Sequence, residues 1–256
     1  MNIRSIFILS IIFLLTSCSF FEEDKDPRKI AASGLSPKAL YDLAQDRVKS
    51  GSIEKAIEEY ELILAAYPGS KYAIQARLDM AYNLYKQKKY MRAINELDKF
   101  IKKYPNIKST PYAYYLRGVI AEAKSTSILD NLITDSAQRD VKSVSDAYFY
   151  YLELIEAYPD STYSIDAATK LVKLKNTLAR HEFYVAIYYT EIGSYIAAIN
   201  RCKFVIENYS NSASIPDILN LMAYNYDQIN ANELAADTRK ILISSYPNYT
   251  SKYSIN

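Results

Sequence analysis

The sequence predicts an all-α protein, a helical solenoid of five helix pairs, and three observations support this fold class. Apolar residues recur at i, i+3, i+4 and i+7 along most of the chain, which is the spacing of amphipathic helices. Only 5 of the 256 residues are glycine, which argues against a turn-rich β fold. Small residues, alanines and prolines also return at fixed offsets, which indicates that one unit is repeated.

Residues 72–105 display this unit most plainly. The first predicted helix carries Leu78 and Leu84 on its apolar face, and the second carries Leu97 and Phe100. Polar residues connect the two helices. Pro105 ends the second helix, because proline has no N–H to donate and disfavours helical backbone at the residue before it. The unit is therefore a pair of helices.

Three marks define each copy: a small residue in the first helix, an alanine in the second, and a terminator twelve residues after that alanine. The marks fall at Ala44, Ala56 and Pro68; Ala81, Ala93 and Pro105; Gly118, Ala147 and Pro159; Ala186, Ala198 and Ser210; and Ala223, Ala235 and Pro247. A tyrosine precedes every terminator. Small residues at fixed positions allow two helices to cross closely. The pattern resembles the tetratricopeptide repeat, with a basic period of 37 residues and no tryptophan.

The chain begins with the pattern of a lipoprotein signal. In residues 1–17, Arg4 precedes an apolar run that is too short for a comfortable transmembrane span, as in a secretory signal peptide. Residues 15–18, Leu-Thr-Ser-Cys, resemble a bacterial lipobox, which implies cleavage before Cys18 and lipidation of its thiol with acyl chains such as palmitate. The alternative is an ordinary signal peptide with a cysteine just past the cut. The polar residues 18–36 are expected to be a flexible, lipid-anchored tether.

The helix pairs then follow in order. The expected segments are repeats 1 and 2 at 37–108, repeat 3 with an insertion at 109–162, a long helix with repeats 4 and 5 at 163–248, and a tail at 249–256. The insertion lengthens repeat 3 by about 17 residues, and the second helix of this repeat is expected to resume at Ala147. Serines just before the predicted helices are expected to act as N-caps, namely Ser36, Ser70, Ser161 and Ser212.

No catalytic constellation is evident in the sequence. His181 is the only histidine, so neither a His-based metal cluster nor a catalytic triad can be assembled. Cys202 falls on the inward stripe of a helix and is expected to be a buried small hydrophobe. A net charge of +2 gives no electrostatic case for nucleic acid. We therefore predict a protein that is not an enzyme and that uses no cofactor or metal.

Two stretches narrow the resemblance to one family. Residues 160–167, with Asp-Ser-Thr-Tyr at their start, and residues 178–201 (LARHEFYVAIYYTEIGSYIAAINR) resemble the BamD (ComL) family, as do the lipobox and the order of the five repeats. Two departures are Ile192-Gly193, where the family usually has Arg-Gly, and Ser210 at the fourth terminator. The family is the lipoprotein component of the outer-membrane β-barrel assembly machinery.

The resemblance implies a non-catalytic scaffold that is lipid-anchored in the outer membrane and faces the periplasm. Its implied partners are the barrel subunit (BamA-like), other assembly lipoproteins, and unfolded outer-membrane protein segments. Ser19, rather than aspartate, follows the lipidated cysteine, and among such lipoproteins this favours the outer membrane. The alternative function is that of a periplasmic tetratricopeptide lipoprotein coordinating cell-wall synthesis or envelope division.

Two binding surfaces are expected, the first from the resemblance to tetratricopeptide proteins and the second from the resemblance to the BamD family. The first helices of the repeats line a groove that would bind clients through Tyr41, Leu78, Tyr82, Tyr85, Tyr112 and Tyr115. The alternative for these residues is packing between repeats. Arg201 is the candidate contact for the barrel subunit, because arginine is favoured at interfaces. The alternative for Arg201 is an intramolecular salt bridge to Glu182 or Glu191.

Overall fold

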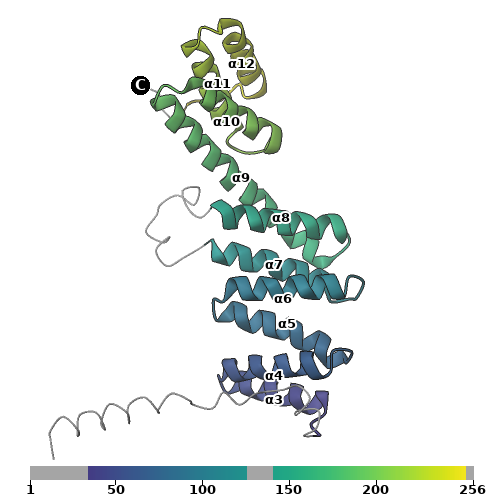
Figure 1. The fold of residues 1–256 in the computed structure, drawn as a ribbon. Helices are drawn as coiled ribbons and strands as arrows, with labels where there is room; N and C mark the ends of the chain where they lie inside the picture. The colour runs from purple at the N-terminus through teal and green to yellow at the C-terminus, as the bar shows by residue number, and fades with distance from the viewer. Residues whose placement is uncertain (1–33, 126–140, 252–256) are drawn as a thin grey trace, which may run out of the picture. The chain divides into compact units, whose positions relative to one another are not determined.

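The computed structural model describes residues 34–125 and 141–251, and this part of the chain holds ten α-helices and no strand (Figure 1). The helices are α3 Pro37–Lys49, α4 Ile53–Ala66, α5 Lys71–Lys86, α6 Tyr90–Lys103, α7 Thr110–Lys124, α8 Val141–Ala157, α9 Thr162–Glu191, α10 Tyr195–Asn208, α11 Ile215–Gln228 and α12 Asn232–Ser245. They form five consecutive pairs, which confirms the predicted all-α, tetratricopeptide-like fold class. Within the described ranges, no helix combines the length and apolarity needed to cross a membrane.

The described residues divide into two compact units, one that ends at residue 76 and one that begins at residue 77. In the first unit α3 packs on α4, with Leu40 and Ala44 of α3 and Tyr60 of α4 buried between them. Ser36 is the expected N-cap of α3, and its Oγ accepts a hydrogen bond from the N–H of Ala39 at 3.2 Å. This bond satisfies one of the four backbone donors that a helix start leaves without a partner.

In the second unit each helix from α6 to α12 packs on the next one along the chain, and first helices of successive pairs also touch, α7 with α9 and α9 with α11. The predicted long helix is confirmed, since α9 runs unbroken from Thr162 to Glu191 (Figure 1). Leu174 of α9 lies in a core shared with α7 and α8, whereas Phe183 and Ala186 lie in a core shared with α10, α11 and α12. The one helix therefore joins two hydrophobic cores.

The turn inside each uninterrupted repeat has the same backbone conformation. The residue seven positions after the small mark has a positive φ in all four cases, with values of 78° at Gly51, 60° at Lys88, 75° at Gly193 and 58° at Asn230. The N–H of the following residue donates to a carbonyl five positions back, as from Ser194 to Tyr189 at 2.8 Å. This is the Schellman arrangement that closes a helix and satisfies its last carbonyls.

Repeat 3 differs from the other repeats at its small mark. A Cβ atom added to Gly118 would overlap the ring of Tyr151, a residue of α8 that is fully buried. The Tyr151 hydroxyl donates to Glu122 Oε2 at 3.1 Å, which holds the ring in place. Glycine at this mark therefore makes room for a large aromatic ring in the repeat that carries the insertion.

Three details differ from the expectations. The second helix of repeat 3 begins at Val141 rather than Ala147, because Val144 is already buried in the core. Ser212 is not an N-cap: α11 begins at Ile215, with proline in its first turn, and the Ser212 hydroxyl instead accepts from the N–H of Ser214 at 3.2 Å.

The prediction that residues 249–256 form a tail is wrong for Tyr249. This residue packs on the core of the last repeats, and its hydroxyl donates to Oδ1 of Asp217 at 2.7 Å. The other expected helix starts, at Ser70 and Ser161, are confirmed by side-chain caps.

Candidate functional site

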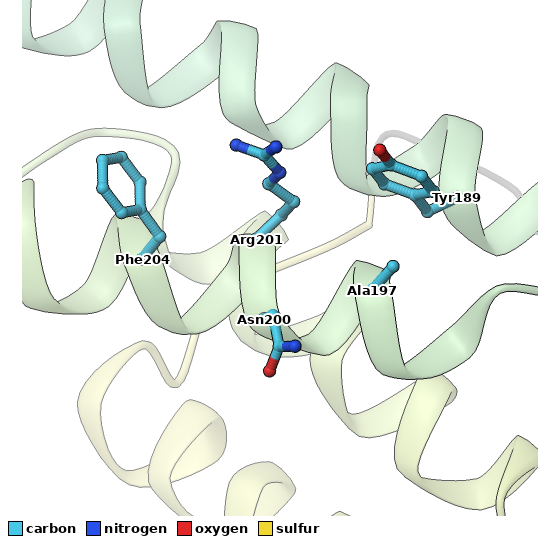
Figure 2. Close-up of a pocket in the computed structure, with 5 residues that line it drawn as sticks. All are labelled: Tyr189, Ala197, Asn200, Arg201 and Phe204. Atoms are coloured by element: carbon cyan, nitrogen blue, oxygen red, sulfur yellow. The ribbon is translucent and has the colours of Figure 1, made fainter.

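Arg201 lies on the second helix of repeat 4 and lines an open pocket of about 330 Å³. The other lining residues are Tyr189 from α9 and Ala197, Asn200 and Phe204 from α10. Figure 2 shows the side chains of Arg201 and Phe204 on the side of α10 that faces α9, the helix that carries Tyr189. The side chain of Asn200 points away from α9. The pocket thus combines a guanidinium with an aromatic ring on either side along the groove between two helices.

The guanidinium of Arg201 has an intramolecular partner. Its Nη1 lies 3.2 Å from Oε2 of Glu182 on α9. The intramolecular salt bridge that was the alternative for Arg201 is therefore present, with Glu182 as the partner. The pair is nevertheless asymmetric, because the side chain of Glu182 is 16% exposed and that of Arg201 is 45% exposed. Since an arginine has five N–H donors and this contact uses one of them, Arg201 keeps donors for a second acceptor.

The same repeat positions are occupied by an ion pair in repeat 2. Glu182 stands four residues before the small mark Ala186, and Arg201 stands three residues after the alanine mark Ala198. The corresponding residues of repeat 2 are Arg77 and Glu96, whose Nη1 and Oε2 atoms are 2.6 Å apart. The polarity of the pair is therefore reversed between the two repeats.

Repeat 3 places two tyrosines at these positions, Tyr114 and Tyr150, and both pack against a third residue, Arg117. The guanidinium carbon of Arg117 lies 5.1 Å from the ring centre of Tyr114 and 4.2 Å from that of Tyr150. Arg117 also pairs with Asp98 of α6 at 2.8 Å and with Glu153 of α8. A buried arginine here links three consecutive helices through cation–π and ionic contacts.

Most tyrosines of the expected client groove belong to one of two groups of neighbouring rings, and the first group lies around Tyr82. Tyr82 is 43% exposed and its ring lies 6.2 Å from that of Tyr85, which in turn lies 6.3 Å from the ring of Tyr90. Burial raises the pKa of the Tyr112 hydroxyl, and nearby Tyr82, Tyr163 and Asp79 raise it further. Tyr82 lies on α5 and Tyr112 on α7, which are the first helices of repeats 2 and 3.

A second group surrounds the start of α9. The ring of Tyr163 lies 5.6 Å from that of Tyr112 and 5.3 Å from that of Tyr115. The Tyr115 hydroxyl donates to Oδ2 of Asp166 at 2.6 Å, and burial together with this carboxylate raises the pKa of Tyr115 far above its usual value. Sequence reasoning did not assign a binding role to Tyr163 or Asp166. Their spacing of three residues at the start of an amphipathic helix, which puts both on one face, is the pattern that could have indicated them.

Two expected groove residues stand apart from these groups. Leu78 is 3% exposed and belongs to the core, so the expectation that it is an exposed groove position is wrong. Its position on α5, three residues before the buried mark Ala81, places it on the inward stripe. Tyr41 belongs to the first unit, where its half-buried ring lies 5.6 Å from that of Tyr72. The other four tyrosines all belong to the second unit.

The chain has two cysteines, Cys18 and Cys202. Cys18, the expected lipidation site, lies outside the described residues. Cys202 is fully buried in the core of the last repeats, which confirms its expected packing role, and burial raises the pKa of its thiol to about 12. A thiol with so high a pKa is almost entirely protonated at neutral pH and is a poor nucleophile.

The chain is similar to a known protein family and to several known proteins. A family described as YfiO, outer membrane lipoprotein, matches residues 34–242. The chain is 35% identical over 213 residues to the outer membrane protein assembly factor BamD of Neisseria gonorrhoeae, covering 83% of this chain and 80% of that protein. It is 30% identical over 243 residues to BamD of Xylella fastidiosa strain 9a5c, covering 94% and 82%. A solved tetratricopeptide repeat protein from Parabacteroides merdae is similar at 17% identity and a TM-score of 0.41, covering 86% and 83%.

Proposed function

Because this chain belongs to the YfiO family of outer membrane lipoproteins, whose BamD members are outer membrane protein assembly factors, we propose that it is a non-catalytic scaffold of the β-barrel assembly complex. In this role it binds the periplasmic domains of the barrel subunit and holds unfolded outer-membrane protein segments for membrane insertion. The observation that carries the proposal is the family match, which spans the helix pairs from the first to the last.

The surface proposed for the barrel subunit is the pocket around Arg201. Its guanidinium is 45% exposed and flanked by Tyr189 and Phe204, a combination of arginine and aromatic residues that is enriched at protein interfaces. Glu182 holds the guanidinium in place without covering it. The arginine is therefore preorganised, so that little conformational entropy is lost when a partner carboxylate binds it.

The surface proposed for clients is the tyrosine face of α5 and α7, with Tyr82, Tyr85, Tyr112 and Tyr115. Half-buried aromatic rings offer large contact area while losing few rotamers, which suits extended segments of varied sequence. Among the described residues, the hydroxyls of Tyr82, Tyr85 and Tyr112 make no hydrogen bond, so they can donate to the backbone of a bound strand. Tyr41 is proposed as a client contact of the first unit, and Leu78 is not proposed as a contact.

Lipidation at Cys18 is proposed to anchor the protein to the inner face of the outer membrane, with other assembly lipoproteins as neighbours. More than one acyl chain makes a stable anchor, where a single chain is marginal. Residues 18–36 would then give the helix pairs reach from the membrane, because a polar tether of this kind is flexible.

The test is affinity purification of the tagged, membrane-extracted protein in three forms: unchanged, Arg201→Ala, and Tyr82→Ala with Tyr85→Ala. We expect a large β-barrel protein with repeated periplasmic domains to accompany the unchanged protein. Arg201→Ala should weaken recovery of this partner about tenfold while retaining client peptides, and the tyrosine double variant should do the reverse, as for hot-spot residues at two separate surfaces. Circular dichroism checks that each variant keeps its helices.

Other results would reject parts of the proposal. Full retention of the barrel subunit by Arg201→Ala would remove Arg201 from the interface, and unchanged client affinity in the tyrosine variant would remove the groove. Recovery of peptidoglycan synthases or division proteins in place of the barrel subunit would favour the alternative, a periplasmic lipoprotein that coordinates cell-wall synthesis or envelope division.

A further inference from the structure

The tyrosine cluster formed by Tyr112, Tyr115 and Tyr163 borders a carboxylate, that of Asp166, which pairs with no cation among the described residues. Asp166 is exposed, in the second turn of α9, and its Oδ2 accepts the Tyr115 hydroxyl at 2.6 Å. Within the described ranges it takes part in no ion pair. Its charge is therefore fixed in position by a neutral donor and left uncompensated by this part of the chain.

The nearest lysine along the helix does not supply the missing charge. Lys170 stands one turn after Asp166, but its Nζ is 3.0 Å from Oε2 of Glu122 on α7, and both side chains are largely buried. The same Glu122 oxygen also accepts the hydroxyl of Tyr151. Lys170 is therefore engaged by Glu122, and Asp166 keeps only the Tyr115 hydroxyl as a partner among the described residues.

The arrangement of the rings suits a cation. The Tyr163 ring is tilted by 51° to the ring of Tyr112 and by 32° to that of Tyr115, so the π-faces of the cluster point in different directions beside the carboxylate that Tyr115 contacts. The negative face of a tyrosine ring attracts an ammonium or guanidinium group, and a fixed carboxylate adds an ion pair. A single carboxylate is too few ligands for Ca²⁺ or Mg²⁺, which take about six or more oxygens. The chemistry therefore favours an organic cation.

We propose that this cluster binds a lysine or arginine side chain of a client segment, so that the groove prefers strands with a cationic residue among their aromatic ones. The inference rests on the proposed client binding, and it adds a charge preference to that role. Tyr115 is a positioning residue in this scheme, because its hydroxyl orients Asp166. Tyr112 and Tyr163 contribute the ring faces.

The test uses two synthetic peptides of alternating aromatic and polar residues that differ at one central position, lysine in one and acetyl-lysine in the other. Acetylation keeps the stem of the side chain and removes its charge. Binding to the full, lipidated protein in detergent is measured by fluorescence anisotropy for the unchanged chain and for Asp166→Asn. The amide that this substitution introduces can still accept the Tyr115 hydroxyl through its oxygen, so the variant should fold. Asp237→Asn is the matched control, because Asp237 is also an exposed helical aspartate, on α12.

We expect the lysine peptide to bind the unchanged protein about fivefold more tightly than the acetyl-lysine peptide, the scale of one exposed cation–π and ion-pair contact. Asp166→Asn should abolish this preference, Tyr115→Phe should reduce it, and Asp237→Asn should leave it intact. Equal affinity of both peptides for the unchanged protein would overturn the charge preference while leaving client binding in place. Failure of both peptides to bind would overturn client binding and, with it, this inference.

Discussion

Repeats 2 and 4 carry an ion pair at the same two positions, and the two pairs differ in polarity and in exposure. In repeat 2 the side chains of Arg77 and Glu96 are 14% and 11% exposed, and Lys99 adds a second cation to Glu96 at 2.6 Å. In repeat 4 the acid is on the first helix and the exposed arginine on the second, beside a pocket. The pair joins the two helices in both repeats, and only in repeat 4 is one of its charges, the Arg201 guanidinium, open to solvent.

Repeat 3 shows what happens when the ion pair is absent. Its two tyrosines at the equivalent positions hold Arg117 between them, and Arg117 bonds to α6 and α8 instead. The position is thus a general cross-helix contact whose chemistry can change, and a charge there is not by itself evidence of function. Exposure beside a pocket is what sets Arg201 apart.

The largest difference between the two pairs should appear in stability. Glu96→Ala leaves the guanidinium of Arg77 buried without its partner, so we expect the free energy of unfolding to fall by about 3 kcal/mol. Glu182→Ala exposes an arginine that water already reaches, and the expected loss is below about 1 kcal/mol. Urea unfolding followed by circular dichroism measures both.

A second substitution separates the effect of the unpaired Arg77 charge from the loss of packing by the Glu96 side chain. Arg77→Met should recover part of the stability lost in Glu96→Ala when the two changes are combined, because the uncompensated charge is then gone. Equal losses for Glu96→Ala and Glu182→Ala would show that exposure does not distinguish the two pairs.

A smaller effect is expected from exchanging the charges of repeat 4. The double variant Glu182→Arg with Arg201→Glu gives repeat 4 the polarity of repeat 2 and keeps an ion pair at this position. We expect stability within about 0.5 kcal/mol of the unchanged protein, as for other substitutions that preserve an exposed pair. Binding of the barrel subunit, measured by co-purification, should nevertheless fall about tenfold, because the exposed charge is reversed. Normal binding by this variant would assign Arg201 a purely structural role.

The smallest effect should come from the turns that close the first helices of the same two repeats. Lys88 has a φ of 60° where Gly193 has a φ of 75°, and a side chain disfavours this left-handed region. Lys88→Gly should therefore stabilise the protein by about 0.5 to 1 kcal/mol, and Gly193→Ala should destabilise it by about 1 kcal/mol. Thermal unfolding of the two variants checks the signs, and a loss of stability in Lys88→Gly would mean that strain at this turn is negligible.

The candidate site was only partly accessible from the sequence. Tyr82, Tyr85, Tyr112 and Tyr115 could be placed on first helices because helical periodicity assigns faces. Leu78 was wrongly included with them, although its spacing of three residues from Ala81 puts it on the apolar face that packs into the core. Asp166 was missed because its partner Tyr115 is 51 residues away, across the insertion.

Local sequence was enough to specify the helix pairs, their marks and the family, because periodicity, small residues and terminators are properties of short stretches of chain. It was also enough for the unbroken course of α9, since no proline or glycine interrupts residues 162–191. Three other features became known from the folded structure alone: Glu182, rather than Glu191, meets Arg201; the repeat 2 pair is closed while the repeat 4 pair is open; and Ser212 does not cap a helix. These features depend on which side chains cover a position from other helices, and burial of that kind is a property of packing rather than of spacing.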